Sequence, residues 1–130
     1  MRVLSVRQPF ASLIVSGEKR CENREWKALS KIKGEWIAIH ASAKPEEGED
    51  VTGLPLGAII GAAYLDHCCW LKDVPKKWRR HHHTNGPCCL LFAGHLEIVP
   101  VKCKGKLGFW NCPQDVETTI REGIELCGKS

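Results

Sequence analysis

Three charged residues follow a short apolar segment within a few positions, and their types suit either recognition or catalysis. Lys19, Glu22 and Arg24 come directly after the segment QPFASLIVSG. A carboxylate can accept hydrogen bonds from an exocyclic amine and a ring N–H of a nucleobase, whereas lysine and arginine can donate to a phosphate or a carbonyl. The competing interpretation is an ion pair between Glu22 and Arg24, which would contribute little to stability at the surface.

Two further polar residues are candidates for the same site. Gln8 stands just before the apolar segment and could supply a second contact to the edge of a base. His40, in EWIAIHAS, could contact a ligand or move a proton, because its ordinary pKa lies near neutrality. A histidine hydrogen-bonded to the backbone is an equally good interpretation of His40.

The same cluster also permits a hydrolytic interpretation. Amide cleavage needs a base or nucleophile, a group that stabilises the oxyanion, and an acid for the leaving amine. Lys19 could be the base if it were held as a neutral amine, and Glu22 could assist. A neighbouring carboxylate favours the charged ammonium, however. Binding does not require a neutral Lys19, whereas catalysis does, so Lys19 and Glu22 suit binding better than catalysis.

A basic segment accounts for the net charge of the chain. Residues 72–87, KDVPKKWRRHHHTNGP, contain five Lys or Arg and one Asp, and this excess equals the formal net charge of +4 of the whole chain. Cations interleaved with an indole suit a polyanion, since the cations neutralise phosphates and the indole stacks on a base. We expect contacts to nucleic acid from Lys76, Lys77, Trp78, Arg79 and Arg80. A solvated loop that only adds charge is the alternative.

The cysteines do not predict a metal site. The chain has eight, including the pairs Cys68-Cys69 and Cys88-Cys89 on either side of three consecutive histidines. Adjacent residues of a strand point to opposite faces, and no pair has the C-x-x-C spacing that lets two thiolates reach one ion. We therefore expect free thiols, no metal and no cofactor.

The length and composition indicate one globular domain spanning residues 1–130. Hydrophobic residues make up 43% of the chain and charged residues 26%. No apolar run approaches the roughly 18 residues needed to span a bilayer, and the first residues do not resemble a signal peptide. These features predict a cytoplasmic protein without a membrane partner.

Hydrophobic periodicity predicts an α+β protein. Residues 2–6 alternate like a strand, a short helix follows, and Gly17 is its natural end because glycine takes the left-handed conformation at no side-chain cost. Further strands are expected in residues 20–26, 35–42 and 58–70, with a bend or bulge at Gly61. Residues 88–101 are expected to form one bent strand or two, with an edge near Pro100. The last helix is predicted to open at Pro113 and to bury Val116, Ile120 and Ile124. Five or six short strands with a helix near each end favour a small barrel.

The opening stretch carries a motif that resembles a known family. LSVRQPFASLIVSGEKRCENREW, followed by GEWIAIHASAK, is similar to the ASCH domain, whose signature G-x-K-x-x-E-x-R reads here as Gly17, Lys19, Glu22 and Arg24. The likeness continues through GAIIGAAYL and KGKLGFW and so covers most of the chain. The resemblance implies a PUA-like fold, a small mixed β-barrel used for RNA binding.

The resemblance also implies what the site would do. Family members are thought to bind RNA or nucleotides in a cleft beside the signature, and some small bacterial members resemble amidohydrolases that remove the acetyl group from acetylated cytidine. In those, the signature lysine is catalytic and a threonine stands at the position of Glu22. We expect binding of RNA or a modified nucleoside, with the amidohydrolase, or a ribonuclease, as the alternative. A protein-interaction module with an unknown protein partner is the third class.

Overall fold

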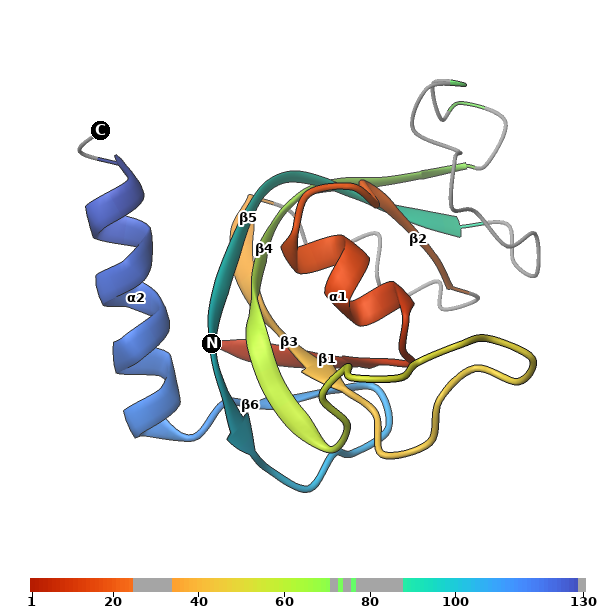
Figure 1. Ribbon diagram of the computed structural model, residues 1–130. Coiled ribbons are helices and arrows are strands. Elements are labelled where there is room, and N and C mark those ends of the chain that lie inside the picture. Colours follow the sequence, from red (N-terminus) through yellow and green to blue (C-terminus); the bar gives the residue numbers. More distant parts are fainter. Residues whose placement is uncertain (25–33, 71–72, 74–75, 77–87, 129–130) are drawn as a thin grey trace.

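The computed structural model describes residues 1–24, 34–70, 73, 76 and 88–128, with the backbone alone at residues 23, 24, 88 and 128. Within these ranges, six strands and two helices follow one another (Figure 1). In order, they are β1 (Arg2–Val6), α1 (Phe10–Val15), β2 (Cys21–Arg24), β3 (Glu35–Ala41), β4 (Ala58–Trp70), β5 (Cys88–Lys102), β6 (Phe109–Asn111) and α2 (Gln114–Gly128). The expected α+β class is confirmed, and the described residues contain six strands where five or six were predicted.

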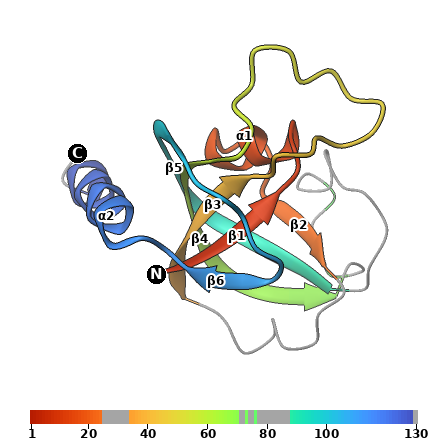
Figure 2. The same ribbon diagram turned by 90° about the horizontal axis from the view of Figure 1, so that it is seen from below.

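The strands form one mixed sheet in the order β2-β5-β4-β3-β1-β6. β1 and β3 run parallel, and the other neighbouring pairs are antiparallel. The sheet curls into a half-barrel, with α1 within its concave side and α2 outside it (Figures 1 and 2). This arrangement agrees with the expected small mixed barrel and places one helix on each face of the sheet.

Each helix covers its own hydrophobic cluster. The inner cluster joins Ala11, Ile14 and Val15 of α1 to side chains from β1, β3, β4 and β5. The outer cluster contains Val116 and Ile120 of α2, packed against strand residues of the opposite face. Strand side chains alternate between these two clusters because successive residues of a strand point to opposite faces. The predicted buried stripe of the last helix is confirmed, with Ile124 packed at its margin.

The two long central strands explain the curl of the sheet. β4 and β5 pair along almost their whole length, and the register shifts between Ile59 and Gly61. A Cβ atom on Gly61 would lie 2.1 Å from the carbonyl oxygen of Leu96, so only glycine permits this close approach. The predicted bulge is therefore confirmed. Pro100 lies in a part of β5 whose described partner is β4 alone, which agrees with the predicted edge.

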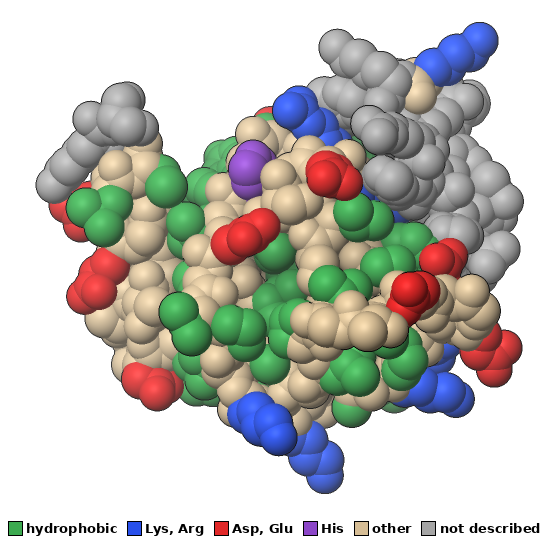
Figure 3. Space-filling view, in the orientation of Figure 1, with side chains coloured by type: hydrophobic (Ala, Val, Ile, Leu, Met, Phe, Trp, Pro, Cys, Tyr) green, Lys and Arg blue, Asp and Glu red, His purple; other side chains and the backbone are tan. Residues whose placement is uncertain are grey.

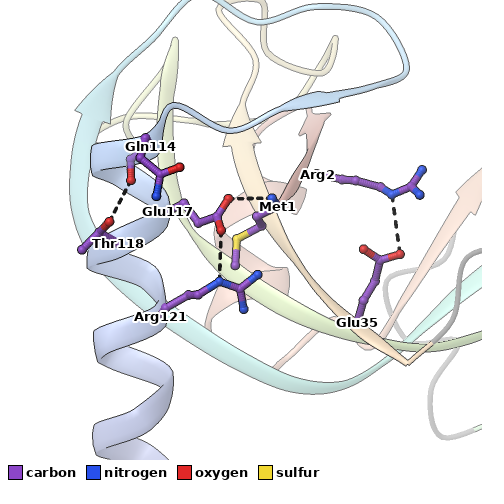
Figure 4. A network of polar contacts seen from close by, with 7 residues as sticks. All are labelled: Met1, Arg2, Glu35, Gln114, Glu117, Thr118 and Arg121. Carbon is purple, nitrogen blue, oxygen red and sulfur yellow. Dashed lines mark hydrogen bonds and ion pairs between the residues drawn. The ribbon is translucent and has the colours of Figure 1, made fainter.

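A group of polar contacts attaches α2 to the first strand (Figure 4). The amino group of Met1 donates to Oε1 of Glu117 at 2.6 Å, and Nε of Arg121 donates to Oε2 at 3.1 Å. These hydrogen bonds, the one from Met1 most of all, hold the pKa of the Glu117 carboxyl below its usual value. The carboxylate thus links the helix to the residue that precedes the beginning of β1.

One expectation about the cysteines is wrong. Cys69, Cys103 and Cys112 are thiols, but Cys68 is disulfide-bonded. The sequence alone did not indicate a disulfide at Cys68. The pairing of β4 with β5 brings together two strand ends that each carry adjacent cysteines, although Cys69 and Cys89, which lie opposite each other, are thiols. None of the helices in the described ranges is long and apolar enough to cross a membrane.

Candidate nucleic-acid interface

The end of α1 determines where the signature residues begin. Gly17 has φ of +86° and its N–H donates to the carbonyl of Ile14 at 3.1 Å. The N–H of Lys19 then donates to the carbonyl of Leu13 at 2.9 Å. Because this bond ties Lys19 to the last turn of the helix, the backbone of Lys19 is held in place before β2 starts.

Lys19 is a buried cation. Its side chain is 3% exposed, and Nζ lies 5.4 Å from the centroid of the Phe10 ring. The side chain therefore extends from the end of α1 back toward its beginning. An ammonium over an aromatic face is stabilised by the ring quadrupole, more strongly where water is excluded.

Glu22 faces the same interior. It is the cross-strand partner of Leu90, and paired residues of neighbouring strands point to the same side of a sheet. Leu90 belongs to the inner cluster that packs around α1, whereas Cys21, the neighbour of Glu22, packs in a small separate cluster with Cys89 and Leu91. The concave side of the sheet thus holds both Lys19 and Glu22.

One oxygen of this carboxylate lacks a hydrogen-bond donor among the described residues. Oε2 of Glu22 is buried, and no group in the described part of the chain donates to it. Most buried polar atoms in folded proteins are hydrogen-bonded, and each exception needs an explanation. An unsatisfied charged acceptor costs at least about 1–3 kcal/mol. The position is therefore suited to a donor from a ligand.

The structure describes only some of the other residues that were expected to contact nucleic acid. The backbone of Arg24 pairs with that of Cys88 at the far end of β2, and its side chain lies outside the described part. Lys76 is exposed, whereas Lys77, Trp78, Arg79 and Arg80 lie outside the described residues. Their expected contacts with nucleic acid stay a prediction.

Gln8 has a structural use. Its side chain is fully buried. Oε1 accepts from the N–H of Ser12 at 2.9 Å, and Nε2 donates to the hydroxyl of Ser12 and to the carbonyl of Pro55 at 3.0 Å. The amide therefore holds the start of α1 against the connection between β3 and β4. A contact with a base edge would have to replace these bonds.

His40 is buried as well, and both ring nitrogens have partners. Nε2 lies 2.6 Å from the carbonyl oxygen of Cys103, and Nδ1 lies 3.0 Å from the hydroxyl of Ser5. A carbonyl can only accept, so Nε2 carries the proton and Nδ1 of the neutral ring accepts from Ser5. The indole of Trp110 packs edge-on against the ring. Burial lowers the pKa of His40, and the bond to Cys103 opposes this only in part.

Two other positions bear on the expected chemistry. Asp66, an acidic residue of β4, is exposed and accepts a hydrogen bond from its neighbour His67. Within the described ranges, no three His, Cys, Asp or Glu side chains are grouped as a metal ion would require. The histidines at 81–83 lie outside those ranges, so the absence of a metal stays a prediction.

The sequence interpretation missed a basic cleft at the other end of β5. It has a volume of about 870 Å³ and is lined by Lys102, Lys104 and Lys106, among others. The signal was present as lysine at every second position of KCKGK, a spacing that places side chains on one side of an extended chain. His40 lies at this cleft, and Gln8 holds one of its walls, so the candidates divide between the two ends of the molecule.

Comparisons with known proteins agree with this architecture. The family model for the ASCH domain matches residues 4–105. Human activating signal cointegrator 1 is 27% identical over an alignment of 140 residues. The alignment covers 93% of this chain and 24% of that protein, so this chain spans about a quarter of the length of the human protein.

Solved structures support the fold. A crystal structure of ASCH from Zymomonas mobilis superposes with a TM-score of 0.61 at 18% identity and covers 93% of each chain. A serine-to-alanine mutant of that same protein gives a TM-score of 0.57 at 19% identity, over 93% of this chain and 94% of the other. Identities this low indicate a shared fold alone. The match to the family model over most of its length shows that the chain belongs to the ASCH domain family.

Proposed function

We propose that this ASCH domain binds RNA or a modified nucleoside on the concave side of its sheet, with Glu22 reading the edge of a base. The general association of the family with RNA supports the class of ligand. The charge of residues 72–87 supports a polyanion, since the basic residues there would meet phosphates. Arg24, at the end of the same strand as Glu22, is included as a phosphate contact.

The buried Oε2 of Glu22, which no described group satisfies, is the observation that carries the proposal. A carboxylate can only accept, so its missing partner must be a donor. The exocyclic amines and ring N–H groups of nucleobases are donors of suitable size. A base bound there would satisfy the acceptor, and the free energy that the empty protein loses by burying it would be recovered on binding.

Lys19 complements this role. Its ammonium can donate to a base carbonyl or a phosphate. The hydrogen bond from its own N–H to Leu13 and the contact of Nζ with Phe10 restrict its motion, so little conformational entropy is lost when a ligand arrives. A donor and an acceptor held on one concave surface suit a heteroaromatic ring that presents both kinds of group.

The substitution Glu22→Gln tests the base contact. It replaces one acceptor oxygen by a donor while keeping the shape, so we expect affinity for a short single-stranded RNA or a modified nucleoside to fall about 10- to 100-fold, as for the loss of a hydrogen bond to a charged group. The dependence of affinity on salt should not change, because Glu22 touches no phosphate. Isothermal titration calorimetry at several salt concentrations measures both quantities.

The matched control is Glu18→Gln, which removes the same charge four residues earlier from an exposed side chain. It should leave the affinity within about twofold of the unchanged protein, because an exposed charge away from the ligand contributes little to binding. Equal affinities for Glu22→Gln and the unchanged protein would refute the proposal. Mass spectrometry of the same mixtures with N4-acetylcytidine separates binding from hydrolysis, because only hydrolysis releases acetate.

A second prediction concerns Lys19. Because the side chain is buried, Lys19→Met is the appropriate change: it removes the charge and keeps an unbranched side chain over Phe10. We expect a melting temperature within a few degrees of the unchanged protein and the loss of most RNA or nucleoside binding. A variant that unfolds, while its remaining folded fraction binds normally, would make Lys19 a structural residue.

A further inference from the structure

The basic cleft lies away from the site around Glu22. β2 pairs with residues 88–91 at the beginning of β5, whereas the cleft is lined by the last residue of β5 and by the segment 103–107 that follows it. Figure 3 shows Lys or Arg side chains projecting at the lower edge of the molecule, where Figure 1 places this end of β5. The cleft volume of about 870 Å³ is within the usual range for small-molecule sites.

The lysine-bearing wall is held against the sheet. The carbonyl of Cys103 accepts from His40 at 2.6 Å, and its N–H donates to the carbonyl of Gly57 at 3.0 Å. Two residues further along the chain, a Cβ atom on Gly105 would lie 2.6 Å from the ring of His40 and 2.9 Å from the hydroxyl of Ser5. Only glycine permits this approach, so Lys104 and Lys106 flank a point where the backbone rests on buried side chains.

The opposite wall is held by Gln8. Its Nε2 donates to the carbonyl of Pro55 at 3.0 Å, next to Leu56, which lines the cleft. The N–H of Gly57 donates to the carbonyl of Ala41 at 2.8 Å. Both walls are thus attached to the sheet by hydrogen bonds of buried groups, and the cleft is already formed before a ligand arrives.

The charge of the lining indicates the ligand. Lys102, Lys104 and Lys106 are exposed, and none of them forms an ion pair with a residue in the described part of the chain. Among the described residues that line the cleft none is acidic, and Ser42 adds a hydroxyl group to the lining. Three ammonium groups of one sign raise the local concentration of anions, and the hydroxyl of Ser42 can donate to the oxygen of an oxyanion.

The apolar part of the lining indicates what the anion is attached to. Leu56 and Leu107 stand at the cleft, and Leu107 is 99% exposed. An exposed leucine beside three lysines suits a ligand that joins a phosphate to a flat apolar ring. We propose that this cleft binds the phosphate of a nucleotide, either free or within an RNA strand, as a second site distinct from the base site at Glu22.

The test uses the full chain labelled with ¹⁵N and three probes: adenosine 5′-monophosphate, adenosine, and a single-stranded RNA of eight nucleotides. The double variant Lys104→Gln/Lys106→Gln removes two positive charges from the cleft. As a control, Arg2→Gln/Arg121→Gln removes two positive charges from β1 and α2, where both arginines form surface ion pairs. Amide chemical shifts locate each probe, and titration calorimetry measures its affinity.

We expect the monophosphate, the RNA or both to shift the amides of residues 103–107, and adenosine to leave them unchanged. A response to the monophosphate assigns the cleft to free nucleotides, and a response to RNA alone assigns it to a strand. The cleft variant should lose at least about tenfold in affinity and, for RNA, about 1.4 units of salt dependence, at roughly 0.7 per phosphate contact in a single strand. The control variant should lose much less.

Two results would overturn the inference: amides of residues 103–107 that respond to neither phosphate probe, or equal losses in the cleft variant and the control. The Glu22→Gln variant separates this inference from the proposed function. If the cleft binds phosphate but Glu22 binds no base, the Glu22→Gln variant binds every probe normally and still shows the chemical shift changes at residues 103–107. If only the base site exists, the cleft variant binds RNA normally.

Discussion

His40 shows how a single residue can be polar, buried and still structural. Its ring donates to the carbonyl of Cys103 and accepts from Ser5, and it supports the backbone at Gly105. The lysines of the neighbouring cleft add positive charge on the same side. Protonation would place a hydrogen on Nδ1 facing the hydroxyl of Ser5 and a charge in a desolvated position, so the folded protein favours the neutral ring.

The stability of the protein should therefore depend on pH through His40. Its pKa in the folded state is lowered from 6.5 by burial. Between that lowered pKa and 6.5 the unfolded chain binds more protons than the folded one, so the contribution is complete above about pH 6.5 and is lost as the pH falls. Urea denaturation between about pH 5 and 8 should show the free energy of unfolding falling on acidification.

The substitution His40→Gln provides the comparison. It removes the titrating ring but keeps a donor for Cys103, so the part of the pH dependence that belongs to His40 should disappear. Contributions from the other histidines are common to both proteins and cancel in the difference. Identical pH profiles for the two proteins would show that His40 does not titrate differently on folding.

At the scale of elements, the turn from α1 into β2 is the feature that places Lys19. Gly17 has positive φ, and a Cβ atom there would lie 2.5 Å from Nε2 of His95. Nδ1 of His95 lies 3.2 Å from the carbonyl of Val15, to which it can donate, so the end of the helix is also held by β5. The glycine is needed for its backbone conformation and for the approach of this ring.

We expect Gly17→Ala to lower the free energy of unfolding by roughly 1–3 kcal/mol, as for other residues forced into the left-handed region. Part of the loss comes from the contact with His95. The double variant Gly17→Ala/His95→Ala removes that contact, so its stability should be higher than the sum of the single effects predicts. Strict additivity in thermal denaturation would mean that backbone strain alone accounts for the loss.

At the scale of the whole molecule, positive charge is concentrated at two places. One is the segment 72–87 between β4 and β5, and the other is the cleft beyond the end of β5. Because β5 joins the two, an RNA strand that followed its length would meet cations at both ends. Glu22, at which we propose the base site, lies in β2, and β2 pairs with the beginning of β5.

The segment 72–87 should therefore contribute to the salt dependence of RNA binding. Replacing Lys76, Lys77, Arg79 and Arg80 by Ser should flatten the slope of log affinity against log salt by about 3, at roughly 0.7 per phosphate contact in a single strand. Removing Arg2, Arg7 and Arg121 should flatten it far less for each charge. Fluorescence anisotropy with a labelled RNA measures both slopes, and an unchanged slope in the first variant would leave the segment without a role in binding.

The sequence by itself determined the features that depend on local pattern. The stop at Gly17, the buried stripe of Val116 and Ile120, and the bulge at Gly61 were predicted because periodicity and glycine conformation act over a few residues. The signature containing Lys19 and Glu22 was also legible, as a motif of fixed spacing.

Tertiary structure alone decided what surrounds those residues. Glu22 faces the concave side because β2 pairs with the distant β5, and its buried oxygen is unsatisfied because none of the described neighbouring elements brings a donor there. His40 and Gln8 are held by Cys103 and Pro55, which lie far along the chain. Side-chain type and spacing carry no information about such contacts, because hydrogen-bond partners and burial arise only when separate elements pack together.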